Sequence, residues 1–267
     1  MTAFQKVVKY LAMAFACFLA ITIIGSILGV IGFFFDDSVA KNVKTYEISS
    51  QIKSLKIEIG AADFTVKQGE KFSVESNLKH LTVDDENGVL TIKEKRKIGI
   101  SAKSAVLTLY IPEETVLENA EILTGAGQLT VKSLVADTVN FEFGAGEVVI
   151  EKLIAKSKAN LVGGAGEVTI SDGALHNLKL DMGVGQLNFT SALTGKCELN
   201  LGVGEANITL LGKKDDYKLD LEKGVGSMRV DGTNVSSAKG FGNGKNKVSV
   251  SGGVGDTSLN FKESDGK

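Results

Sequence analysis

Hydrophobic and polar positions alternate one by one in short stretches along the second half of the chain. In one stretch Leu178, Leu180 and Met182 share one face, while Lys179 and Asp181 fall on the other. A period of two is typical of β-strands that bury one face. The pattern therefore predicts a run of short strands.

Pairs of glycines, separated by one alanine or valine, recur between these stretches. The seven copies read TGAGQLTV, FGAGEVVI, GGAGEVTI, MGVGQLNF, LGVGEANI, KGVGSMRV and GGVGDTSL. The first glycines of successive pairs lie 19, 20, 19, 19, 22 and 29 residues apart. This period is too short for paired-helix repeats and suits one coil of a β-solenoid. The residues predicted to form the repeat corners are Gly125, Gly127, Gly144, Gly146, Gly164, Gly166, Gly183, Gly185, Gly202, Gly204, Gly224, Gly226, Gly253 and Gly255.

The alternation changes phase at each glycine pair. Val184 shares the parity of Met182, but the next inward positions fall at Leu187 and Phe189, an odd step that one flat strand cannot make. We interpret each pair as a sharp bend between two strands, where glycine allows unusual dihedral angles or a close approach between coils. The central alanine or valine is predicted to point into the core. Seven coils would then stack in parallel over roughly 34 Å, with the last copy as the end coil.

The region before the regular repeats also reads as strands, with less regular spacing. Residues 45–120 are predicted to start and cap the solenoid, and residues 121–262 to carry the glycine pairs. IGAADFTV, which begins at Ile59, resembles a degenerate first corner. Asn87 and Gly88 are a two-residue hairpin signal.

A long apolar segment lies near the N-terminus. Tyr10 to Phe35 is a run of 26 residues without a charge, and at about 1.5 Å per residue a helix of this length crosses a hydrocarbon core of about 30 Å. Lys6 and Lys9 precede it, so the positive-inside rule places the N-terminus in the cytoplasm. The predicted fold class is thus an all-β, single-chain β-solenoid (β-helix) of about 19–20-residue coils behind one N-terminal transmembrane helix. The predicted divisions are residues 1–9 cytoplasmic, 10–35 transmembrane, 36–44 linker, 45–262 solenoid and 263–267 tail.

These features predict a single-pass protein of the cell membrane with an extracellular C-terminal domain. A cleaved signal peptide is the alternative, although its apolar stretch would be only about 7 to 15 residues long. A lipoprotein cut before Cys17 is a further alternative, which the unbroken apolar run beyond it disfavours. Gly25 and Gly29 form a G-x-x-x-G pair that would let two such helices approach closely as a homodimer.

Composition and charge exclude some classes of function. The net charge of −2 and the absence of long basic runs remove the electrostatic footprint of nucleic-acid binding. Two cysteines cannot build a disulfide scaffold, and Cys197 shares the parity of Leu199 and Leu201, as a buried residue would. No cofactor motif is present: the G-x-G copies recur between strands, without the following helix of a nucleotide site.

Several of these segments together resemble a known family. LTVDDENGVLTIKEK, then LTLYIPEE, then the TGAGQLTV-like copies are similar, in that order, to bacterial envelope proteins with β-strand repeats, a family of unknown function labelled "putative adhesin". The resemblance covers about residues 45–262. It implies a surface-exposed β-helical domain, often carried by Gram-positive cells and in some cases tied to envelope stress, and brings no catalytic residues. The stretch from Gly232 to Asn246 departs from the pattern and is predicted to be a protruding loop.

One column of polar residues could carry chemistry. The residue after each glycine pair is polar, and stacked acids in such a column could bind a divalent cation, since hard cations prefer carboxylate oxygens. The other interpretation is a solvated polar ladder, because only two of the acids are neighbours. The column comprises Gln128, Glu147, Glu167, Gln186, Glu205, Ser227 and Asp256.

The leading functional hypothesis is a non-enzymatic binding, adhesion or envelope-stress protein that contacts another protein, the cell wall or a surface. Long repetitive faces suit recognition, and Asn188 and Asn207 are predicted to align one coil apart. The alternative is a β-helical polysaccharide lyase or hydrolase acting on cell-wall or extracellular glycan. Such an enzyme needs paired carboxylates or a base, usually with aromatic platforms. The chain has no tryptophan, and His80 and His176 lie in polar connections, as surface residues would.

Overall fold

The computed structural model describes residues 39–95 and 105–263. Within them the fold is all-β apart from one 3-10 turn, Lys214–Asp216. No helix in these ranges is long and apolar enough to cross a membrane; the predicted anchor, residues 10–35, with Cys17, Gly25 and Gly29, lies outside them. The strands are β1 (Val39–Glu47), β2 (Ser54–Gly69), β3 (Ser73–Leu78), β4 (Leu81–Glu86), β5 (Val89–Glu94), β6 (Val106–Pro112), β7 (Leu117–Val131), β8 (Leu134–Ile150), β9 (Leu153–Ile170), β10 (Gly173–His176), β11 (Leu178–Thr194), β12 (Lys196–Asn200), β13 (Val203–Leu211), β14 (Tyr217–Glu222), β15 (Met228–Val230), β16 (Thr233–Asn234), β17 (Ala238–Phe241), β18 (Asn246–Ser251) and β19 (Thr257–Lys262).

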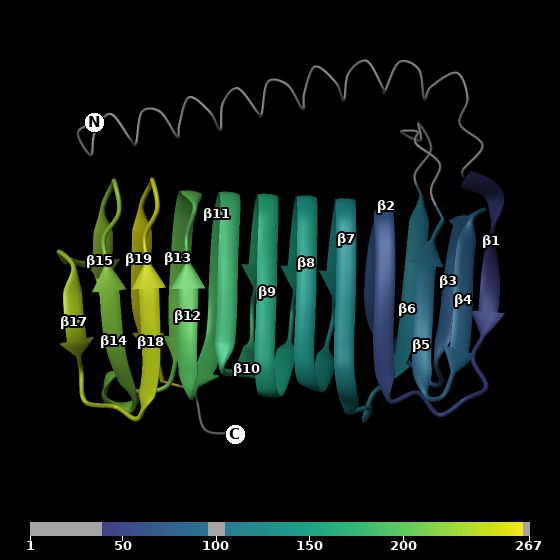
Figure 1. The fold of residues 1–267 in the computed structure, drawn as a ribbon, viewed down its shortest axis with the longest axis horizontal. Helices are drawn as coiled ribbons and strands as arrows, with labels where there is room; N and C mark the ends of the chain where they lie inside the picture. The colour runs from purple at the N-terminus through teal and green to yellow at the C-terminus, as the bar shows by residue number, and fades with distance from the viewer. Residues whose placement is uncertain (1–38, 96–104, 264–267) are drawn as a thin grey trace, which may run out of the picture.

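The central strands form a row of parallel coils (Figure 1). β7, β8, β9, β11 and β13 pair in parallel from one to the next, and the glycine corners lie in register throughout. Each pair of neighbouring strands is about 4.8 Å apart, so the row grows by this distance with every coil. The predicted β-solenoid-like stack is confirmed.

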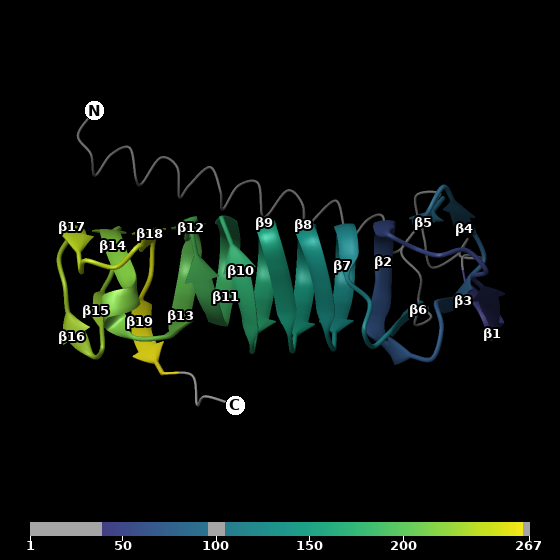
Figure 2. The same cartoon turned by 90° about the horizontal axis from the view of Figure 1, so that it is seen from below.

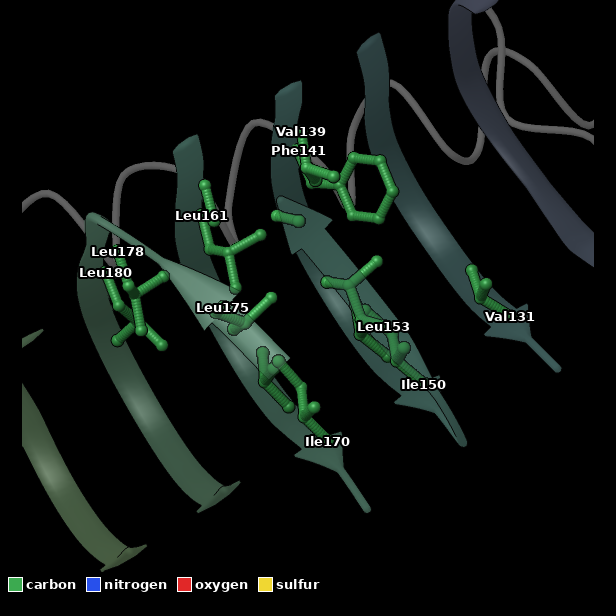
Figure 3. Packing of buried hydrophobic residues seen from close by; sticks show 14 of the residues in the cluster. Val131, Val139, Phe141, Ile150, Leu153, Leu161, Ile170, Leu175, Leu178 and Leu180 are labelled. Atoms are coloured by element: carbon green, nitrogen blue, oxygen red, sulfur yellow. The ribbon is translucent and has the colours of Figure 1, made fainter. Parts of the chain in front are cut away.

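Each regular coil carries three short alternating stretches around one apolar core, where the sequence predicts two. Figure 3 shows the buried side chains of successive coils gathered in this core. Its largest fully buried side chains are Phe64, Phe141 and Phe189. The coil of β8 buries Leu134 and Ala136, then Val139, Phe141 and Phe143, then Val148 and Ile150.

Six of the seven corners expose their central residue, and the seventh, Val254 in the inner coil, is half-buried. Val184 is 52%, Val203 39% and Val225 56% exposed, and the alanines at the equivalent positions are exposed as well. The prediction that these residues point into the core is therefore wrong. At so sharp a bend the backbone on either side converges on the inside, which leaves room for a side chain only on the outside.

Two separate constraints demand glycine at the corners. The second glycine of each pair has a positive φ, +128° at Gly146 for example, a conformation that other residues rarely adopt. A Cβ added to Gly146 would lie 1.9 Å from the carbonyl oxygen of Gly127 in the neighbouring coil. A Cβ added to the first glycine, Gly144, would lie 2.0 Å from the carbonyl oxygen of Gly125. Both predicted reasons for glycine, unusual dihedral angles and close approach between coils, are therefore confirmed. The first glycine of a pair meets the close approach alone, and the second meets both.

At the C-terminal end the spatial order of the coils differs from their order in sequence. β18 pairs with β12 on one side and β14 on the other, and β19 pairs likewise with β13 and β15 (Figure 1). The last glycine copy is therefore an inner coil, and the prediction that it ends the stack is wrong. The spacings of 22 and 29 contain the extra residues that carry the chain past this slot and back into it.

The crossing past the slot depends on Tyr217. Its buried side chain donates a hydrogen bond from the hydroxyl to the carbonyl oxygen of Leu211 at 2.6 Å and accepts one from the backbone N–H of Leu193 at 3.3 Å. These bonds fasten the start of β14 to the two coils before the slot. The 3-10 turn, Lys214–Asp216, lies just before it.

The stretch from Gly232 to Asn246 is not a protruding loop. β16 pairs antiparallel with β15, and β17 pairs antiparallel with β14. Figure 2 shows β16 and β17 beyond β14 and β15, at the end of the stack. The segment therefore covers the last coil.

The N-terminal end uses a similar interleaving. β2 pairs in parallel with β7 on one side and with β5 and β6 on the other, although β5 and β6 follow it in sequence. Ala61 is the partner of Ala126, which confirms the degenerate first corner. Asn87 and Gly88 join β4 and β5 with positive φ angles of 53° and 76°, the predicted hairpin turn. β1 pairs with β3 and takes in residues 39–44 of the segment predicted as linker.

Candidate functional site: the glycine corner and its flanking face

The central residues of the corners form one continuous row, which we call the corner ridge. Each member is the direct strand partner of the next, from the first coil to the last. The row is built of alanine over its first half and of valine over its second. In spatial order it runs Ala61, Ala126, Ala145, Ala165, Val184, Val203, Val254 and Val225.

Glycine rows border the corner ridge on both sides. Gly125, Gly144 and Gly164 precede its alanines, and the second glycines follow them. Because these rows have no side chains, the aliphatic groups stand above their surroundings and the backbone beside them is open to approach. All 14 glycines predicted as corners lie along this edge.

The predicted polar column runs parallel to the ridge. Gln128 donates from Nε2 to Glu147 Oε2 at 2.7 Å, and Asn188 donates from Nδ2 to Glu167 Oε1 at 3.1 Å. Asn207 in turn donates to Asn188 Oδ1 at 3.2 Å, so the predicted alignment of these two asparagines is confirmed. In space the column runs Gln128, Glu147, Glu167, Gln186, Glu205, Asp256 and Ser227.

At the far end of the column the order of its last two members is reversed by the interleaved coil. Ser227 donates from both its hydroxyl and its backbone N–H to Asp256 Oδ1, at 2.7 and 3.0 Å. These bonds favour the ionised carboxylate and hold the pKa of Asp256 below its ordinary value. Across residues 39–95 and 105–263, no three potential ligands converge as a metal site would require. The geometry in this column is that of a hydrogen-bonded ladder.

The strand face next to the column is flat and carries small hydroxyl and amide groups. Thr65, Thr130, Val149, Thr169 and Asn188 are direct strand partners from one coil to the next. Their side chains are half-buried against each other, so they form a shallow, ordered surface. Such a face offers repeated hydrogen-bonding groups at the spacing of the coils.

Charged pairs occupy the face on the other side of the corner. Lys179 Nζ lies 2.8 Å from Asp181 Oδ2, and Asn200 donates to Asp181 Oδ1 at 2.6 Å. The hydrogen bond from Lys179, followed by that from Asn200, lowers the pKa of the Asp181 carboxyl. Lys196 and Glu198 form a similar pair at 2.8 Å one coil further on.

The residues with catalytic potential are dispersed. His80 is exposed in the turn between β3 and β4, whereas His176 lies several coils away, with Nδ1 2.9 Å from the hydroxyl oxygen of Thr194. Cys197 is buried and unpaired, as predicted, and burial raises the pKa of its thiol. Reactive thiols have a lowered pKa and partial exposure, so this cysteine belongs to the core.

Hollows along the corner edge are shallow. The two beside the ridge hold only about 20 Å³ each, whereas pockets for small ligands hold about 300 Å³ or more. A wider and open hollow of about 500 Å³ lies near the N-terminal coils, between Glu58, Glu94 and Glu142. Glu94 Oε2 there accepts hydrogen bonds from the backbone N–H groups of Gly60 and Ala61 at 2.7 and 3.3 Å, so this carboxylate fastens the degenerate corner.

Sequence reasoning identified the corner glycines and the polar column but missed the corner ridge. The signal was present, since alanine or valine stands between the glycines in every copy. The alternation of hydrophobic and polar positions predicted that these residues point into the core. They point outward because of the geometry of the bend.

Several solved structures are similar to this chain at low sequence identity. A structure of a putative cell adhesion protein from Clostridium sporogenes is 13% identical, with 83% of this chain and 99% of that chain covered at a TM-score of 0.34. A putative adhesin from Parabacteroides distasonis is 12% identical, with 83% of this chain and 96% of that chain covered at a TM-score of 0.36. A putative adhesin from Bacteroides fragilis is 15% identical, with 82% of this chain and 98% of that chain covered at a TM-score of 0.32. Likenesses as weak as these carry no argument about fold or function. No curated protein matches the chain. The Toastrack DUF4097 family matches residues 52–240, more than half of the chain, and the chain therefore belongs to this family.

Proposed function

We propose that this chain is a non-catalytic binding protein of the cell envelope, and that it contacts its partner along the corner ridge. The observation that carries the proposal is the exposure of the ridge valines, which reaches 52% at Val184 and 56% at Val225. Burying a whole valine side chain is worth about 1.5 kcal/mol or more. An unbroken apolar row that leaves this gain unused is typical of an interaction site.

The polar column supplies the second half of the proposed contact. Gln128 is hydrogen-bonded to Glu147, and Glu167 accepts a hydrogen bond from Asn188 on the face beside the column, so these groups hold their positions before a ligand arrives. Preorganised groups lose little conformational entropy on binding. An elongated partner with an apolar strip and flanking hydrogen-bond donors would fit this edge.

The distribution of titratable groups supports a non-catalytic role over the glycan lyase alternative. A lyase needs a base and a charge-stabilising group within reach of one sugar ring. His80 and His176 lie on different coils, and the carboxylates of Glu147 and Glu167 accept hydrogen bonds from neighbouring side chains. We therefore favour binding over bond cleavage.

The envelope location in this proposal rests on the sequence. Residues 10–35 are long enough to span a membrane, and Lys6 and Lys9 favour a cytoplasmic N-terminus. Protease treatment of intact cells that carry a C-terminally tagged chain is the direct test. Loss of the tag from a membrane-bound product is expected; a protected tag would reverse the orientation.

Photo-crosslinking tests the binding edge itself. A photoreactive amino acid replaces Val184 in one strain and Val116 in another; Val116 is 49% exposed and lies off the corner ridge, so it is a matched control. A discrete crosslinked product from position 184 alone is expected. Equal products from both positions, or none from either, would reject the ridge as the contact surface.

A further inference from the structure

The inner position of the last coil creates a slot that residues 246–262 fill. One wall is formed by β12 and β13 and the other by β14 and β15, and the two strands of the filling segment pair with both walls. On the first side the backbone N–H of Val254 donates to the carbonyl oxygen of Gly202 at 2.8 Å. On the second side the backbone N–H of Gly252 donates to the carbonyl oxygen of Glu222 at 2.8 Å. Both walls precede the filling segment in sequence.

The filling segment contributes its own share of the core. Val248, Val250 and Leu259 are at most 1% exposed, and Thr257 is 5% exposed. Without the segment, each wall would present an unpaired parallel edge over this apolar surface, a structure that readily accepts another strand. Residues 246–262 of a second copy match both edges, because the same residues already pair with these edges in register within one chain.

A single long connection joins this segment to the rest of the described stack. Residues 231–245 lead into it, and Lys262 is its last strand residue. The regular coils, in contrast, are joined on both sides by turns as short as Lys132–Ser133. β16 and β17 within the connection are two and four residues long and mostly exposed, so they hold it weakly. Fully extended, the connection spans about 50 Å.

We propose that residues 246–262 are an exchangeable coil, so that the slot of one chain accepts this segment from a second copy and two chains join by trading it. Release breaks the strand pairing on both sides of the segment, but only one connection ties the segment to the described stack. A central coil is tied to its neighbours by a connection at each end, so it cannot leave without moving the coils before and after it. Such local opening requires less free energy than global unfolding. The proposal is independent of the binding function proposed above.

Paired cysteines across the slot report the exchange. Asn207 and Ser258 are direct parallel partners in β13 and β19, and Cα atoms about 4.8 Å apart lie within the range of a disulfide. Full-length chains carrying Asn207→Cys or Ser258→Cys, each with Cys17→Ser, are mixed, incubated and oxidised. A disulfide between the two chains forms when the coil of one occupies the slot of the other, and the central pair described next measures the disulfide that arises from collisions alone. A chain with Cys17→Ser alone gives the background yield of disulfide-linked dimer.

A matched pair in the central coils is the control. Thr130 and Val149 are direct partners in the same outward row. A chain with Thr130→Cys can form the matching disulfide with a chain with Val149→Cys by exchange only if a central coil leaves its stack. We expect at least about tenfold more disulfide heterodimer from the slot pair than from the central pair, reflecting the lower cost of local opening. Equal yields would overturn the proposal. Failure of the Asn207→Cys/Ser258→Cys double variant to close within one chain would overturn the register on which it rests.

Discussion

Replacing Gly146 with alanine tests whether the coil spacing depends on the absence of side chains at the corner. Gly146 has φ +128°, and its added Cβ would lie 1.9 Å from the carbonyl oxygen of Gly127. Real Cβ atoms essentially never come closer than 3.0 Å to such an atom, so the two coils would have to move apart by about 1 Å. An N–H···O bond does not survive that displacement.

The expected loss has two parts. Forcing alanine into this backbone conformation costs about 1–3 kcal/mol. Leaving one corner donor or acceptor unsatisfied costs about 1–3 kcal/mol more. Gly146→Ala should therefore lose about 2–6 kcal/mol of unfolding free energy, a large share of the roughly 5–15 kcal/mol that domains possess.

Two control variants separate these parts. Gly232 has φ +75° and no atom within 4 Å of an added Cβ, so Gly232→Ala reports the conformational part. Gly144→Ala reports the steric part, since its Cβ would lie 2.0 Å from Gly125 and its φ lies outside the left-handed range. Urea denaturation followed by circular dichroism gives the three free energies. A loss at Gly146 no greater than that at Gly232 would refute the reasoning about coil contact.

Three further outcomes are expected. Tyr217→Phe removes the hydroxyl partner of Leu211 inside the fold and should lower the unfolding free energy by about 1–3 kcal/mol in urea titrations; an unchanged midpoint would contradict the role of this bond in the crossing. Cys197, whose thiol pKa is raised by burial, should resist alkylation at neutral pH until denaturant is added, as peptide mass spectrometry would show. The lowered pKa of Asp181 stabilises the fold above the ordinary value of 3.8, and this stability is lost as pH falls through the lower folded value. Asp181→Asn should therefore flatten the acid limb of a plot of stability against pH, and an unaltered limb would show that Lys179 does not stabilise the carboxylate.

The period of the sequence was enough to predict the stacked coils, because each corner needs glycine for reasons that act locally. It could not place the central residue of the corner. Alternation assigns every second residue of a strand to the same face. The positive φ of Gly146 and its equivalents interrupts this alternation between the buried residues Phe143 and Val148. The third stretch of each coil was missed for a related reason: the bend after Ala136 contains no glycine to mark it.

The order of the end coils was also beyond the reach of local patterns. All copies present similar edges, so LGVGEANI could pair as well with KGVGSMRV as with GGVGDTSL. The choice depends on connection length: the chain leaves β13, crosses the slot with Tyr217 held by Leu211, and returns through residues 231–245. Spacings of 22 and 29, against 19 or 20 elsewhere, were the only trace of this path.

The interleaved ends also determine how this molecule can change in length during evolution. At both ends the outermost coil is not the first or last in sequence, so a copy appended beyond either end would meet a cap rather than an open edge. A duplicated 19-residue unit between β7 and β11 meets no such obstacle, because each neighbour there pairs in the same register. Relatives of different length should therefore differ by whole copies in the middle of the domain, with both closing arrangements retained.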